Sequence, residues 1–125
     1  MGCELHWEAR GVVKRYFGHV SSEQLLEPVI STEADVRFDR LRFVINDFLE
    51  AQSVAYSPAD IESIAAHDIG AASVNPDIKV AIVTTLPEVI ELVQHYETAS
   101  TQAYPTRIFS TMAEARAWVA EPLER

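Results

Sequence analysis

Two short runs of the sequence are apolar on both faces, and they limit the folds open to the chain more than any other feature. Leu41–Leu49 and Ile78–Thr85 are rich in β-branched and aromatic residues and are short for helices. A strand that is apolar on both faces lies in the interior of a sheet, as the parallel strands of α/β proteins do. We therefore expect both runs to be buried central strands.

The segments around these runs alternate between strand and helix patterns. Residues 3–18 predict an antiparallel hairpin, because their strand-like alternation is interrupted at Gly11, and Thr106–Ser110 predicts a further short strand. Four segments with apolar residues at helical spacing complete the order β-β-α-β-α-β-α-β-α. The predicted fold class is α/β, one domain over residues 1–125 with a mixed, mostly parallel five-stranded sheet and four helices. Pro28 is expected to kink or shorten the first helix.

Each predicted helix begins with the same device, a hydroxyl residue followed three positions later by an acid or an amide. The pairs are Ser21 with Gln24, Ser57 with Asp60, Thr85 with Glu88, and Thr111 with Glu114. In such a capping box each side chain accepts a hydrogen bond from the backbone N–H of the other residue. Pro58 fits the first helical position, where its missing N–H costs nothing. The simplest interpretation of Ser57 is therefore a helix N-cap.

The residues typical of catalytic and metal sites do not occur in the sequence at the spacings that such sites need. The glycines form no phosphate-binding loop, the histidines show no metal-ligand spacing, and Ser57 lacks the glycines of a nucleophile elbow. His67 and Asp68 are expected on the solvated side of a helix. Asp47 lies near the end of a central strand, where α/β sheets bind ligands, although a carboxylate there also binds nearby backbone donors. We expect no enzyme activity, no cofactor and no metal.

The charge and composition of the sequence restrict the classes of partner and the compartment that we expect. The formal net charge of −9 at pH 7 repels nucleic-acid phosphates, so we expect no nucleic-acid partner. No apolar run approaches the roughly 18–20 residues that a membrane span needs. Cys3 is the only cysteine and has no partner for an internal disulfide, which favours the cytoplasm. Apolar residues near a strand edge lead us to expect a homodimer.

Four stretches together resemble one known family. "GVVKRYFGHVSSEQLL", "RFDRLRFVINDF", "NPDIKVAIVTT" and "RIFSTMAEARAWV", taken in the predicted order of elements, are similar to the STAS-like, SpoIIAA-like domains of bacteria. Those domains are related in fold to the anti-sigma-factor antagonists and to the lipid-binding CRAL-TRIO proteins. The resemblance covers nearly the whole chain and rests on core and turn positions. It implies a SpoIIAA-like fold and a non-catalytic module that binds a protein partner.

The resemblance also implies a set of candidate residues. In the anti-sigma-factor antagonists a partner kinase phosphorylates a serine at the start of the second helix, and Ser57 stands at that place. "YSPAD" lacks the Asp-Ser-Ser-Gly-like motif of those proteins. The candidate regulatory or partner-binding residues are Ser57, Asp47, Tyr56 and Asp60. The alternative function is a small-molecule or lipid-binding domain of the CRAL-TRIO type. That alternative needs an apolar cavity, and the narrow helical stripes and short chain predict little room beyond a packed core.

Overall fold

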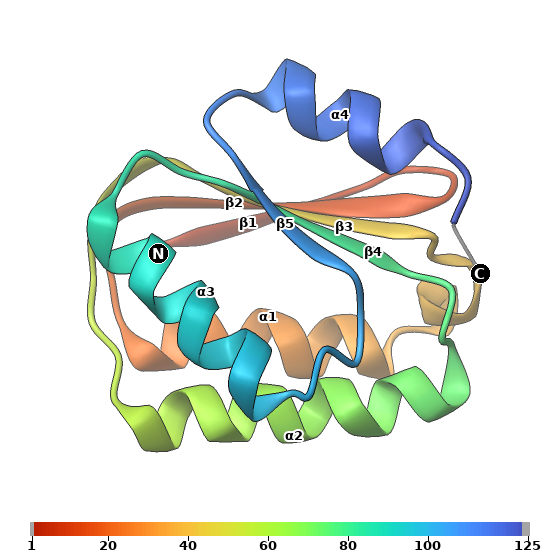
Figure 1. Cartoon of the computed structure of the whole chain (residues 1–125), viewed down its shortest axis with the longest axis horizontal. Helices are drawn as coiled ribbons and strands as arrows, with labels where there is room; N and C mark the ends of the chain where they lie inside the picture. The colour runs from red at the N-terminus through yellow and green to blue at the C-terminus, as the bar shows by residue number, and fades with distance from the viewer. Residues whose placement is uncertain (1, 124–125) are drawn as a thin grey trace.

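The computed structural model describes residues 2–123 as a five-stranded sheet with four α-helices (Figure 1). The strands are β1 (Cys3–Trp7), β2 (Gly11–Val20), β3 (Phe43–Val54), β4 (Lys79–Val83) and β5 (Thr106–Phe109). The helices are α1 (Ser22–Ala34), α2 (Pro58–Val74), α3 (Pro87–Ala99) and α4 (Met112–Ala120), with a short 3-10 helix, η1 (Val36–Arg40), before β3. The predicted order of strands and α-helices is confirmed.

The strands lie side by side in the order of the sequence, β1-β2-β3-β4-β5. β1 and β2 form an antiparallel hairpin, and β2 to β5 are all parallel to one another. Figure 1 shows α1, α2 and α3 below the sheet and α4 above it. The mixed, mostly parallel sheet is therefore confirmed, with three helices on one face and one helix on the other.

The alternating directions of strand side chains divide the apolar interior of residues 2–123 into two cores. Val12 and Val44 face the larger core, beneath α1, α2 and α3. Their neighbours Val13 and Ile45 face the smaller core, beneath α4. Because both faces of the central strands are covered, β3 and β4 need apolar residues at odd and even positions, which accounts for the two runs that the sequence shows.

Gly11 lets an aromatic ring pack directly on the backbone of β2. It is paired with Phe43 of β3, and a Cβ added at Gly11 would lie 2.2 Å from a carbon of the Phe43 ring. We expect Gly11→Ala to lower the free energy of unfolding by about 1–3 kcal/mol, because the ring has to move out of its place. Denaturant unfolding measures the loss.

The matched control for this prediction is Gly70→Ala in α2. A Cβ at Gly70 would meet no atom within 4 Å. An exposed helical glycine replaced by alanine gains up to about 1 kcal/mol. If both variants were equally stable, the Phe43 ring would not depend on the space that Gly11 leaves.

The ends of two elements differ from the sequence prediction. α1 continues through Pro28 to Ala34, so Pro28 does not shorten the helix, which was one of its two expected effects; Pro28 is buried, and packing offsets the lost backbone hydrogen bond. β3 runs on to Val54, beyond the predicted end at Leu49, because β2 continues to pair with it after β4 has ended. No helix among residues 2–123 is long and apolar enough to cross a membrane.

The capping boxes at Ser21 and Ser57 are present as predicted. At α4, Thr111 caps the helix by accepting a hydrogen bond from the Glu114 N–H at 3.2 Å, although Glu114 bonds to the Thr111 hydroxyl and not to its backbone. The predicted box at Thr85 is wrong. Leu86 is the N-cap of α3, and the Glu88 carboxylate instead accepts a hydrogen bond from the Val54 N–H at 3.1 Å.

Candidate functional site

Ser57 caps α2 and is also tied to α1. Its Oγ accepts a hydrogen bond from the Asp60 N–H at 3.3 Å, and Asp60 Oδ2 accepts one from the Ser57 N–H at 2.8 Å. Ser22 Oγ, at the start of α1, donates to the same Asp60 oxygen at 2.6 Å. The hydrogen bond from Ser22, followed by those with Ser57, lowers the pKa of Asp60. Ser57 itself is exposed, so the cap lies at the protein surface.

Ser57→Ala is expected to lower the free energy of unfolding by about 0.5–2 kcal/mol, because the Asp60 N–H loses its acceptor. Ser57→Asp is expected to be close to neutral, since aspartate caps helices as well as serine does. Urea unfolding of the two variants beside the wild type measures both effects. A Ser57→Ala protein as stable as the wild type would show that the hydroxyl does not stabilise the helix.

The structure places Tyr56 near Ser57 and Asp47 away from it. Tyr56 packs partly against the larger core, and burial together with the charges of Glu91 and Glu88 raises its pKa. Asp47 pairs with the last residue of β4, and its Oδ1 accepts a hydrogen bond from the Leu49 N–H at 2.9 Å. Asp47 thus binds a nearby backbone donor. It follows Ile45 by two residues and points to the α4 side of the sheet, opposite α2.

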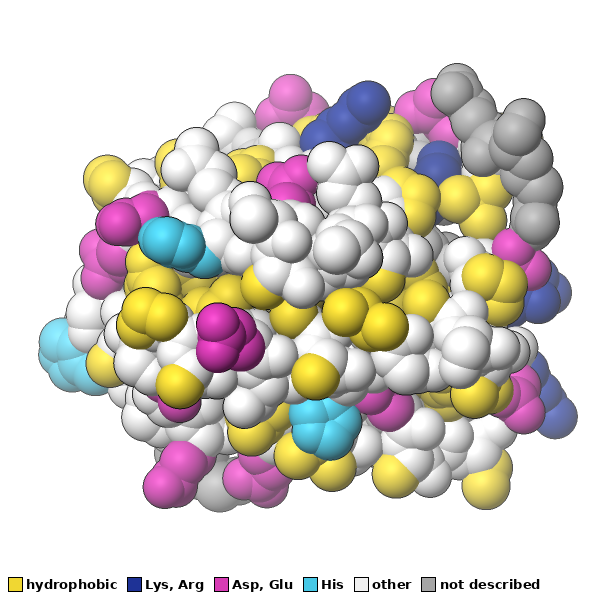
Figure 2. Space-filling model, turned by 60° about the horizontal axis from the view of Figure 1, so that its bottom comes forward, with side chains coloured by type: hydrophobic (Ala, Val, Ile, Leu, Met, Phe, Trp, Pro, Cys, Tyr) yellow, Lys and Arg dark blue, Asp and Glu magenta, His cyan; other side chains and the backbone are white. Residues whose placement is uncertain are grey.

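The layer formed by α1, α2 and α3 carries acidic residues and neither lysine nor arginine. Each helix contributes three acids: Glu23, Glu27 and Glu33; Asp60, Glu62 and Asp68; and Glu88, Glu91 and Glu97. Apolar side chains are exposed among them, including Ile30, Ile69 and Ile90. Figure 2 shows this side of the molecule, with Asp and Glu side chains spread over it and Lys and Arg at its margins. We call this surface the acidic helix layer. Its unbalanced charge creates a negative potential.

A groove of about 450 Å³ crosses the acidic helix layer beside Ser57. It lies between the beginning of α2 and the end of α3 and is lined by Pro58, Ile61, Glu62, Gln94, His95, Thr98 and Ala99. The groove therefore brings residues far apart in the sequence to the same place as the predicted candidate Ser57.

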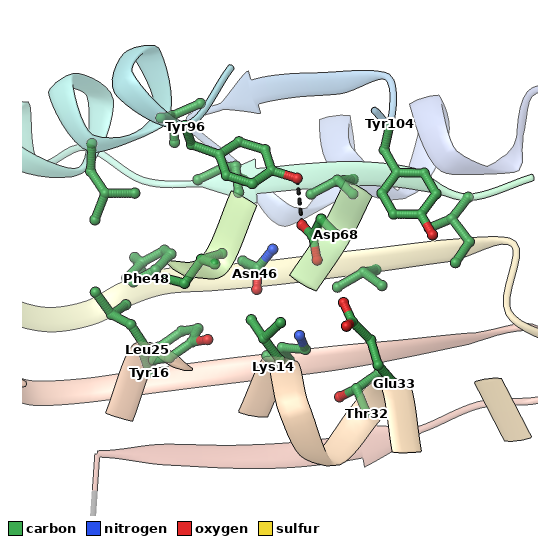
Figure 3. Close-up of a pocket in the computed structure, with 18 of the residues that line it drawn as sticks. Lys14, Tyr16, Leu25, Thr32, Glu33, Asn46, Phe48, Asp68, Tyr96 and Tyr104 are labelled. Atoms are coloured by element: carbon green, nitrogen blue, oxygen red, sulfur yellow. Dashed lines mark hydrogen bonds between the residues drawn. The ribbon is translucent and has the colours of Figure 1, made fainter. Parts of the chain in front are cut away.

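Beneath the acidic helix layer is a cavity of about 90 Å³, which lies between the sheet and α1, α2 and α3 (Figure 3). Its apolar walls are Leu25, Val29, Phe38, Val44, Phe48, Ile64, Ile78, Val80, Ile82, Leu92 and Val93. The space is small, in line with the expectation of little room beyond a packed core, but it is not lined by apolar side chains alone. Polar side chains also line the cavity, at positions that apolar side chains would otherwise fill. They are Lys14 and Asn46 from the sheet, and Glu33 and Asp68 from the helices.

Lys14 and Asn46 lie side by side on β2 and β3, and both line the cavity. Lys14 is only 5% exposed, and burial lowers its pKa. The negative charges of Asp68 and Glu33 act in the opposite direction, but their effect is smaller. Thr32 Oγ1, from α1, is buried without a hydrogen-bond partner in the described part of the chain. The sequence contains a signal for Lys14: it alternates with Val12 and Tyr16, which face the larger core.

Glu33 and Asp68 reach the cavity from α1 and α2. The Tyr96 hydroxyl donates a hydrogen bond to Asp68 Oδ2. The prediction that Asp68 faces solvent is therefore wrong, whereas His67 is exposed as expected. Asp68 follows Ile64 by one helical turn, so the spacing places both on the same face. Burial, with a further contribution from Asp68, raises the pKa of Glu33 to about 9. The Glu33 carboxyl group is thus protonated at neutral pH.

The site carries polar groups but no arrangement for metal binding. Within residues 2–123, no three His, Cys, Asp or Glu side chains are grouped so that they could hold a metal ion. Among the described residues, the cavity and the acidic helix layer are features that could bind another molecule.

Comparison with solved structures identifies the fold of the chain. No model of a known protein family matches the sequence, and no curated protein sequence does. The solved structure of the anti-sigma factor antagonist SpoIIAA in its unphosphorylated form matches with a TM-score of 0.63 and 12% identity, over 94% of this chain and 97% of that one. The chain has the SpoIIAA-like fold.

Two further structures support this assignment. An anti-sigma factor antagonist from Mycobacterium paratuberculosis matches with a TM-score of 0.59 and 10% identity, over 95% of this chain and 93% of that one. A DUF3478-family protein with a SpoIIAA-like fold, from Shewanella loihica PV-4, matches with a TM-score of 0.51 and 13% identity, over 94% and 91%. The shared feature is the arrangement of strands and helices, as the resemblance in the sequence implied.

Proposed function

We propose that this chain is a non-catalytic regulatory module that binds a basic surface of a protein partner through its acidic helix layer. The observation that carries the proposal is the charge of that layer, in which seven acidic residues outside the cavity and no lysine or arginine accompany exposed apolar side chains such as Ile69 and Ile90. The fold that the chain shares with anti-sigma factor antagonists supports a regulatory role.

Charge and apolar surface have different parts in this proposal. Opposite potentials steer two proteins together and select against wrong partners, whereas buried apolar side chains supply much of the affinity. Ser57 directly precedes Pro58, which lines the groove between α2 and α3, and Tyr56 and Asp60 are near Ser57 in the sequence. A phosphate on Ser57 would be stabilised by the N-terminus of α2 and would add negative charge to the surface. Phosphorylation of Ser57 is therefore the regulatory step that we propose for this site.

The proposal includes neither catalysis nor a cofactor, and its setting is the cytoplasm. A sequence with a single cysteine, Cys3, has no internal disulfide to form in an oxidising compartment.

The test compares charge reversals on the two sides of the molecule. Glu62→Lys and Glu91→Lys change exposed acids of the acidic helix layer, and Glu121→Lys makes the same charge change at the end of α4. Partners captured from the source cells by the wild type are purified and titrated against each variant. We expect both helix-layer variants to bind roughly tenfold or more weakly at low salt, and Glu121→Lys to bind like the wild type. Equal affinity for all four proteins would contradict the proposal.

We also propose that the chain forms a homodimer. β1 and β5 are the two edge strands of the sheet, and an edge strand offers unpaired backbone groups to a second copy. In sedimentation velocity experiments, the fraction of protein that sediments as a dimer should increase with protein concentration. Sedimentation as a monomer at every concentration would contradict this part of the proposal.

A further inference from the structure

Lys14 is a buried cation whose ammonium group has no close partner. It is 5% exposed, and in residues 2–123 its Nζ takes part in neither a hydrogen bond nor an ion pair. Lys79 is buried to the same degree, yet its Nζ donates hydrogen bonds to the carbonyl oxygens of Trp118 and Glu121 at 2.8 Å each. An unpaired buried charge is costly, so the comparison indicates that Lys14 is placed to bind something that enters the cavity.

The other groups around Lys14 show what that molecule must offer. Asn46 lies beside Lys14 in the sheet, and Thr32 Oγ1 is buried without a partner. Glu33 keeps its proton at neutral pH, because burial raises its pKa to about 9, and that proton is held in a hydrogen bond with Asp68. The Asp68 carboxylate already accepts the hydrogen bond of the Tyr96 hydroxyl. Lys14, Thr32 and Asn46 can each donate a hydrogen bond, and they therefore suit a ligand with acceptor oxygens.

The size and walls of the cavity limit the rest of the ligand. A volume of about 90 Å³ holds more than one water molecule but is smaller than a cavity of about 150 Å³ that accommodates benzene. Val44, Val80 and Ile82 give the cavity apolar walls that suit a short alkyl group. Glu33 and Asp68, which line the cavity from α1 and α2, are only partly buried, so the cavity is not sealed from solvent on this side.

We propose that this cavity binds a short-chain carboxylate, of about two to four carbon atoms, with its oxygen atoms at the Lys14 ammonium and the Asn46 amide. Figure 3 shows Lys14 and Asn46 on neighbouring strands and Glu33 and Asp68 directed toward the same space from the helices. The ligand carboxylate supplies the direct hydrogen-bonding partner that Lys14 Nζ lacks, since the charge of Asp68 acts on Lys14 without a hydrogen bond or ion pair between them. The inference goes beyond the proposed function and does not depend on it, because neither Ser57 nor the outer surface takes part.

The test uses acetate, propionate and butyrate as probes at neutral pH, with propionamide as the neutral analogue of propionate. Binding is followed by ¹H–¹⁵N NMR of the full chain. We expect propionate to shift the amide signals of Thr32, Asn46 and Asp68. The affinity for propionamide should be at least roughly tenfold lower than the affinity for propionate. Lys14→Met should weaken propionate binding by roughly 10- to 100-fold.

Arg15→Met is the matched control. Arg15 is the next residue of β2, but its side chain lies on the opposite face of the sheet and pairs with Glu4 and Glu50. The Arg15→Met protein should bind propionate with the same affinity as the wild type. The proposal is overturned if none of the three carboxylates shifts the cavity signals at tens of millimolar, or if propionamide binds as tightly as propionate. It is also overturned if Lys14→Met binds propionate as the wild type does. If Lys14→Met does not fold, the comparison of propionate with propionamide on the wild type decides.

Discussion

Replacing Ile45 with alanine is expected to lower the free energy of unfolding by about 2–5 kcal/mol, the range for truncating a fully buried aliphatic side chain. Ile45 lies in the central strand β3, is 0% exposed, and packs in the smaller core with Ala81, Val83 and Trp118. Because α4 alone covers this face, few side chains can move to fill the space that the truncation leaves. Urea unfolding, analysed as a two-state transition, measures the loss.

Leu49→Ala on the same strand is the control for Ile45→Ala. Leu49 is 42% exposed, so its truncation should change the stability by no more than about 0.5 kcal/mol. If Ile45→Ala cost no more than Leu49→Ala, the smaller core would not be the closed core that the structure shows. Ile82→Ala in the larger core should also cost about 2–5 kcal/mol, toward the lower end because Ile82 already borders the cavity.

The wild type is expected to lose stability relative to Glu33→Gln as the pH rises from about 4.5 to about 9. Burial raises the pKa of Glu33 in the folded state, so the folded protein keeps a proton that the unfolded chain has released. This contribution to stability is complete below the unfolded pKa and is lost as the pH rises through the folded one. The slope is at most about 1.4 kcal/mol per pH unit. Urea unfolding at a series of pH values measures it.

Several other groups near Glu33 titrate or carry charge, and both proteins contain them. Lys14 faces Glu33 from β2, Asp68 and His67 from α2, and Tyr104 from the loop before β5. The lowered pKa of Lys14 acts in the opposite direction, since it favours the folded state as the pH rises toward the ordinary lysine value. The difference between the two proteins therefore isolates Glu33. Parallel stability curves would show that the Glu33 carboxyl group does not change its protonation as the structure requires.

Local sequence patterns were sufficient to predict the order of the elements. Runs that are apolar on both faces identified β3 and β4, because strands covered on both sides cannot place polar residues at alternate positions. The boxes at Ser21 and Ser57 located the starts of α1 and α2. The box at Thr85 failed because the Glu88 carboxylate binds the Val54 N–H, a contact between segments distant in the sequence.

The candidate site was harder to predict because it is made of exceptions to the hydrophobic pattern. A lysine within a strand and an aspartate within a helix are ordinarily solvent-exposed, and only the alternation around Lys14 and the helical turn after Ile64 indicate otherwise. The cavity depends on the packing of three helices against the sheet, which no local pattern contains. The acidic helix layer, in contrast, can be found in the sequence once the bounds of α1, α2 and α3 are known.

Amide hydrogen exchange of the full chain, with and without its purified protein partner, tests the central claim most directly. If the acidic helix layer is the binding surface, exchange should slow in residues 59–62 of α2 and residues 94–99 of α3 when the partner is bound. Exchange in α4 (Met112–Ala120), on the opposite face, should not change. Slower exchange in α4 with no change in the acidic helix layer would contradict the account.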